Sequence, residues 1–116
     1  MLTTLVERIP GARGVVFCAL DGEFVDLVVR DATLSAYDMK VFGAHMAATL
    51  LNLQNYSSER GAGGIVEMRL GCEGGTLLCR ALRDGYYVVV LIEKGRTAGP
   101  AAFELQHAAA EIASQL

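Results

Sequence analysis

Residues 35–56 read SAYDMKVFGAHMAATLLNLQNY, and this stretch decides the fold. Ser35 followed by Asp38 resembles a capping box, in which the serine side chain closes the first turn of a helix. Asp31 and Thr33 are alternative N-caps, and we predict one long helix that runs to about Tyr56, a rod of roughly 33 Å when counted from Ser35. One side of this helix carries the large apolar side chains that should pack on a sheet, namely Met39, Phe42, Met46, Leu50 and Leu53.

A second side of the same helix carries small side chains and almost no charge. It consists of Ala36, Gly43, Ala44, Ala47, Ala48 and Leu51, with Tyr37 and Val41 at its edge and Lys40 as its only charge. Small side chains let two helices approach closely, so this side fits a twofold copy of the same helix in a homodimer. The alternative is that the alanines stand there only because they favour helix formation.

The chain around residues 35–56 predicts two strands before the helix and three after it. Residues 14–20 and 86–92 are apolar throughout, which is typical of strands covered on both faces. Asp21-Gly22 is a strong signal for a hairpin turn. The other predicted elements are strands 23–30, 65–70 and 76–82, a first helix ended by Pro10-Gly11, and a last helix with Pro100 in its first turn.

These elements predict an α+β fold with three α/β/α layers, in the order α-β-β-α-β-β-β-α. Short turns make neighbouring strands antiparallel, and the two fully apolar strands require helices on both faces. We therefore expect a five-stranded antiparallel sheet with the long helix on one face and the two short terminal helices on the other. A chain of 116 residues has the length of a single domain, 1–116.

Composition narrows the classes of function. With 53% hydrophobic residues and a net charge of −3, the chain is too apolar for disorder and too acidic to be held to nucleic acid by bulk charge. No apolar run approaches the roughly 20 residues of a membrane span, and Glu7 argues against a signal peptide. Cys18, Cys72 and Cys79, an odd number without C-x-x-C spacing, favour reduced thiols and a cytoplasmic location.

The sequence carries no catalytic or cofactor-binding signature. The P-loop pattern is absent, and neither His45 nor His107 has a partner at the spacing of metal ligands. We therefore expect no enzyme activity, no cofactor and no metal site. Five arginines are candidates for exposed charges, either solvated or in contact with a partner: Arg30, Arg60, Arg80, Arg83 and Arg96.

The order of elements resembles that of the Roadblock family of dynein light-chain-related proteins. The similarity covers nearly the whole chain: the short first helix with Pro10-Gly11, the strand that ends in Leu20-Asp21-Gly22, the long alanine-rich helix, the glycine-bounded strand triplet and the short last helix. These shared features are patterns of architecture and not of chemistry.

This resemblance implies a non-catalytic regulator or scaffold that binds a small Ras-like GTPase, as bacterial and archaeal members of the family do. It also implies a homodimer or a heterodimer with a sheet that is continuous across the twofold. Strand 65–70 supplies the edge, and the long helices pack near the axis. Together with the small-residue side of the helix, the resemblance predicts a dimer interface formed by Gly43, Ala44, Ala47, Ala48, Leu51, Val66, Met68 and Leu70.

A second hypothesis is a small-ligand sensor of PAS-like or profilin-like architecture, because such domains also combine a five-stranded antiparallel sheet with helices. Its pocket would lie between the long helix and the sheet and would be lined by Met39, Phe42 and Met46. A cavity at these residues would favour the sensor, whereas solid packing there would favour the scaffold.

Overall fold

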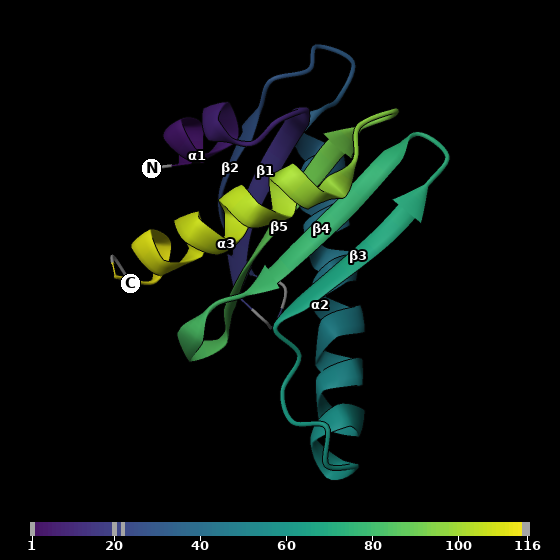
Figure 1. Cartoon of the computed structure of the whole chain (residues 1–116), viewed down its shortest axis with the longest axis vertical. Helices are drawn as coiled ribbons and strands as arrows, with labels where there is room; N and C mark the ends of the chain where they lie inside the picture. Colours follow the sequence, from purple (N-terminus) through teal and green to yellow (C-terminus); the bar gives the residue numbers. More distant parts are fainter. Residues whose placement is uncertain (1, 20, 22, 115–116) are drawn as a thin grey trace.

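The computed structural model describes residues 2–19, 21 and 23–114 (Figure 1). The helices are α1 (Leu2–Arg8), α2 (Ala36–Glu59) and α3 (Ala98–Ser114). The strands are β1 (Ala12–Ala19), β2 (Phe24–Val29), β3 (Glu67–Cys72), β4 (Gly75–Ala81) and β5 (Tyr86–Glu93), and the 3-10 turn Arg83–Gly85 precedes β5. Leu20 and Gly22 of the predicted first hairpin lie outside the described residues.

The strands form one antiparallel sheet in the order β2-β1-β5-β4-β3, so β2 and β3 are its two edges. Helices α1 and α3 cover one face, and α2 crosses the other (Figure 1). The predicted α+β fold with its three layers is therefore confirmed. Strands β1 and β5, which contain the two segments predicted to be apolar throughout, lie side by side at the centre of the sheet.

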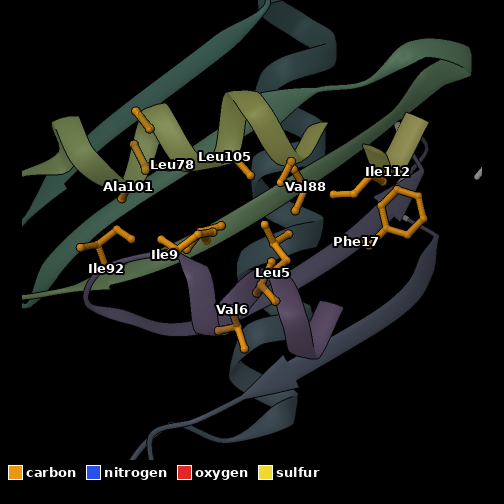
Figure 2. Close-up of a cluster of buried hydrophobic side chains, with 14 residues drawn as sticks. Leu5, Val6, Ile9, Phe17, Leu78, Val88, Ile92, Ala101, Leu105 and Ile112 are labelled. Carbon is orange, nitrogen blue, oxygen red and sulfur yellow. The ribbon is translucent and has the colours of Figure 1, made fainter. Parts of the chain in front are cut away.

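Each face of the sheet has its own hydrophobic core. Figure 2 shows the core under α1 and α3, which includes Leu5, Val6, Ile9, Phe17, Leu78, Val88, Ile92, Ala101, Leu105 and Ile112. The core under α2 includes Val16, Cys18, Met39, Met46, Leu50, Cys79, Tyr87 and Val89. Because side chains of β1 and β5 alternate between the two cores, the buried middle of each strand is apolar at every position, and the charged residues Arg13 and Glu93 lie near the strand ends.

Helix α2 begins where the sequence predicts, since the Ser35 side chain accepts a hydrogen bond of 2.9 Å from the backbone N of Asp38. It ends at Glu59, just before Gly61, whose φ of +82° suits glycine. At 24 residues α2 is about 36 Å long, whereas strands of 6 to 8 residues span only about 20–26 Å. The C-terminal part of α2 therefore extends past the end of the sheet (Figure 1).

Strand β3 starts two residues later than the pattern predicts. The side chain of Gln54 in α2 replaces a strand partner for Ile65: its Oε1 accepts from Ile65 N at 2.7 Å and its Nε2 donates to Ile65 O at 3.2 Å. The strand then continues to Cys72, and the predicted five-residue turn shortens to Glu73 and Gly74. Gly75 makes this possible, because a Cβ there would lie 2.3 Å from the carbonyl oxygen of Ile92.

Asp31 fixes the turn between β2 and α2. Its carboxylate accepts hydrogen bonds from the Oγ1 and the backbone N of Thr33, at 2.7 and 2.8 Å, and from Nε of Arg13. These bonds, those from Thr33 first, lower the pKa of Asp31 to about 2. The ionised carboxylate is thus the form that the native turn prefers.

This preference predicts how acid affects the fold. The pKa of an aspartate in an unfolded chain is about 3.9, so the Asp31 carboxylate stabilises the fold above about pH 4. The contribution is lost as the pH falls toward the folded pKa of about 2. We expect Asp31→Asn to lower the urea midpoint near neutral pH and to lose less stability than the wild type between about pH 4 and pH 2. An equal acid loss in both proteins would contradict this role, and Asp26→Asn, at an exposed strand residue, is the matched control.

Candidate interaction surface

The side of α2 that meets the sheet combines large and very small side chains. Its buried residues are Met39, Gly43, Met46, Ala47 and Leu50. A Cβ at Gly43 would lie 2.8 Å from Sγ of Cys18, and the Tyr87 hydroxyl donates a hydrogen bond of 2.7 Å to the Gly43 carbonyl. The prediction that Gly43 and Ala47 face outward is therefore wrong, because the closest approach of helix and sheet takes the smallest side chains.

The remaining small-residue positions of α2 lie toward the edge strand β2. Lys40 marks this side, since its Nζ lies 4.3 Å from the ring centroid of Phe24 in β2. Ala44, Ala48 and Leu51 follow Lys40 by 4, 8 and 11 residues, which places them along the same side of the helix, and all three are exposed. The two parts of the predicted interface, this side of α2 and strand β3, are thus on opposite sides of the helix axis.

The opposite side of α2 faces the half of the sheet that β4 and β3 form. Phe42 is half-buried on this side and packs against the core under α2, as Met68 of β3 does from its strand. Leu53, predicted to be core, is exposed over 44% of its surface because it lies in the part of α2 that passes the end of the sheet. Near Leu53, Gln54 holds Ile65 beside the helix.

Strand β3 separates apolar from charged side chains. Met68 and Leu70 lie opposite Cys79 and Leu77 of β4, which belong to the core under α2, so they are on the α2 face of the sheet. On the other face, Glu67 pairs with Arg69 at 2.9 Å and with Arg80 at 3.9 Å. Val66, just before the strand, is exposed over 66% of its surface.

We call the apolar residues along this edge the β3-side surface: Phe42, Leu53, Ile65, Met68 and Leu70. They extend along one side of α2 and along an edge strand whose outer backbone groups have no neighbouring strand among the residues that the structure describes. Met68 and Leu70 belong to the interface that the sequence predicts, whereas the helical pattern places Leu53 in the core. The length of α2 relative to the strands is the signal that could have placed Leu53 outside.

The space between α2 and β1, where the sensor hypothesis expects a pocket, is closely packed. Met39 and Met46 are buried, and a Cβ at Gly14 would lie 3.1 Å from Cγ of Met39. A methyl group would already be crowded at Gly14 and Gly43, so a ligand has no room beside these two glycines. This packing favours an interaction domain over a sensor with a cavity at Met39.

Two of the three thiols belong to the core under α2. Cys18 and Cys79 are buried, and burial raises the pKa of both, that of Cys79 to about 12. They are therefore neutral core residues, whereas Cys72 at the end of β3 is exposed.

Within residues 2–19, 21 and 23–114 no three His, Cys, Asp or Glu side chains are grouped to hold a metal ion. No helix in that part of the chain combines the length and the apolarity that crossing a membrane needs.

No protein-family model and no curated protein matches the sequence, but solved structures match the fold. A Roadblock/LC7 domain from Streptomyces avermitilis superimposes with a TM-score of 0.81 at 16% identity, over 97% of this chain and 92% of that one. MglB of Myxococcus xanthus gives a TM-score of 0.79 at 12% identity, over 97% and 94%. Profilin IB of Acanthamoeba castellanii gives 0.57 at 14% identity, over 90% and 87%. The chain has the fold of Roadblock/LC7 domains.

Proposed function

We propose that the chain is a non-catalytic homodimer that binds and regulates a small Ras-like GTPase. The observation that carries the dimer is the β3-side surface, an apolar strip that runs beside an unpaired strand edge. A monomer that stayed alone in solution would keep both the strip and the free backbone groups of β3 in contact with water.

A second copy of the chain is the occupant that fits this surface. When two copies meet about a twofold axis, β3 lies antiparallel to its own copy and the two sheets can join through backbone hydrogen bonds. The same operation brings Leu53 and Leu70 of each copy toward the apolar strip of the other. Leu53 and Leu70 are exposed over 44% and 45% of their surfaces, so burying the remainder contributes roughly 1 kcal/mol each.

The role toward a GTPase rests on the resemblance of the sequence to the Roadblock family, and the match in fold supports it. This chain lacks a P-loop, so nucleotide binding would belong to the partner. A dimer whose β3 edges are joined still exposes the β2 side of α2 with Ala44, Ala48 and Leu51. We propose this side, around the long helices, as the region available to a partner.

Solution mass over a concentration series tests the first half of the proposal. Light scattering should give twice 12.4 kDa and the mass should persist on dilution. A monomer at every concentration would contradict the proposed homodimer, since no second copy of the chain would then bind the β3-side surface.

Binding to a GTPase in two nucleotide states tests the second half of the proposal, the regulatory role. We expect the purified dimer to bind a small Ras-like GTPase from the same genome with different affinity in its GDP-bound and GTP-analogue-bound states, as measured by calorimetry. The matched control is the same GTPase without the chain, assayed for hydrolysis and nucleotide exchange. A dimer that binds no such GTPase in either state would keep the assembly but contradict the regulatory role.

A further inference from the structure

A polar groove of about 400 Å³ lies at the end of the sheet where β1 begins and where β2 and β5 end. Its walls are formed by Gly11, Ala12, Arg13, Arg30, Asp31, Glu93 and Arg96. This groove is remote from the β3-side surface, because its residues come from the opposite half of the sheet and the loop after β5. It also contains Arg30 and Arg96, two of the five arginines that the sequence predicts as candidate exposed charges.

The backbone around the groove is held in place from several sides. Arg30 N donates to the Arg13 carbonyl at 2.8 Å, and Glu93 N donates to the Gly11 carbonyl at 2.8 Å. Gly11 has a φ of +76°, and a Cβ there would lie 2.8 Å from Cγ of Arg96, so the stem of Arg96 rests directly on this glycine. Arg13 is thus part of β1, Arg30 is hydrogen-bonded to it through the backbone, and Arg96, in the loop after β5, packs on Gly11.

The charges of the groove are not balanced. Arg13 is paired with Asp31, and Nε of Arg96 lies 2.8 Å from Oε1 of Glu93. The side chain of Arg30 has no hydrogen bond or ion pair with any residue that the structure describes, although its backbone N donates to the Arg13 carbonyl. Three positive and two negative side chains leave a net charge of +1 here, in a chain whose net charge is −3.

The position of Arg30 adds an energetic reason for a ligand. It is bonded through its backbone to Arg13 on the neighbouring antiparallel strand, so two guanidinium groups arise from adjacent positions of β1 and the end of β2. Like charges opposite each other across strands destabilise a sheet. Asp31 offsets the charge of Arg13 but not that of Arg30. An anion beside Arg30 would balance its charge and would meet the planar donors that suit phosphate and carboxylate oxygens.

We propose that this groove binds the phosphate group of a small soluble organic phosphate, with Arg30 as the principal ligand and Arg13 and Arg96 at its sides. The volume of about 400 Å³ exceeds what one phosphate fills and lies within the usual range of small-molecule sites, so it leaves room for the organic part. Asp31 and Glu93 keep two of the arginines oriented and can accept hydrogen bonds from hydroxyl groups of that part.

The test uses the full chain, labelled with ¹⁵N, and ribose 5-phosphate as the probe. We expect saturable shifts of the backbone amides of Arg13, Arg30 and Arg96. Arg30→Gln should weaken binding by at least about tenfold, as expected for the loss of a charge-assisted bidentate contact. Arg60→Gln is the matched control, because it removes one exposed positive charge at the far end of α2 and should leave the affinity within about twofold.

Three comparisons make each outcome decisive. Ribose without phosphate should cause no saturable shift, and sodium chloride at matched ionic strength should cause none either. Inorganic phosphate should bind the same amides more weakly than ribose 5-phosphate. Three results would each overturn the proposal. The first is that ribose binds as tightly as ribose 5-phosphate, and the second is that Arg30→Gln and Arg60→Gln weaken binding equally. The third is that a glutamate-rich peptide binds more tightly than ribose 5-phosphate. Native amide dispersion in both variants shows that folding is not the cause.

Discussion

Ala47→Arg is expected to prevent folding, whereas Ala44→Arg, three residues away on the same helix, is expected to leave a native protein. Ala47 is exposed over 1% of its surface and is part of the core under α2. An arginine there would have to displace α2 from the sheet or bury an unpaired charge. Either costs several kcal/mol, which is comparable with the whole stability of a small domain, about 5–15 kcal/mol.

Circular dichroism and urea unfolding measure this difference directly. Ala44→Arg is the matched control, since it makes the same change in the same helix at an exposed position. A cooperative urea transition of Ala47→Arg near that of the wild type would show that Ala47 does not face the sheet. The orientation of α2 that the contacts of Gly43, Tyr87 and Lys40 indicate would then also be wrong.

Much of the fold follows from the sequence because its strongest signals are local. Ser35 with Asp38 fixes the start of α2, and the apolar segments within β1 and β5 require two covering layers. The start of β3 does not follow, since it depends on the side chain of Gln54 reaching Ile65 eleven residues away. Such a long-range hydrogen bond leaves no mark in the local pattern of residues 65–70.

The orientation of α2 shows a different limit. Helical spacing gives the angle between any two side chains, but it does not say which residues lie at the point of closest approach. Here that point is set by partners on the sheet, Cys18 and Tyr87, which leave space only for Gly43 and Ala47. The positions of the large apolar residues therefore predict a sheet-facing side of α2 that is rotated from the buried side in the structure, and they place Leu53 in the core.

The same rotation separates two hypotheses for the dimer, and two leucines of α2 can decide between them. Leu51 and Leu53 are exposed over 42% and 44% of their surfaces, so they are alike in type and exposure. They differ in direction: Leu51 lies on the β2 side with Ala44, whereas Leu53 lies on the β3-side surface. We expect Leu53→Glu to raise the dissociation constant of the proposed dimer at least about 100-fold, which corresponds to roughly 2.7 kcal/mol. The reason is that a carboxylate would enter an apolar contact.

Leu51→Glu is the matched control and should remain dimeric, with both variants as folded as the wild type because each side chain is exposed in the protomer. Sedimentation equilibrium of the two variants gives their dissociation constants, and circular dichroism checks their folding. If Leu51→Glu dissociates and Leu53→Glu does not, the dimer uses the small-residue side with Ala44 and Ala48, as the helical pattern alone predicts. If both remain dimeric, the twofold contact involves neither side of α2, and β3 alone would have to carry it through its backbone edge.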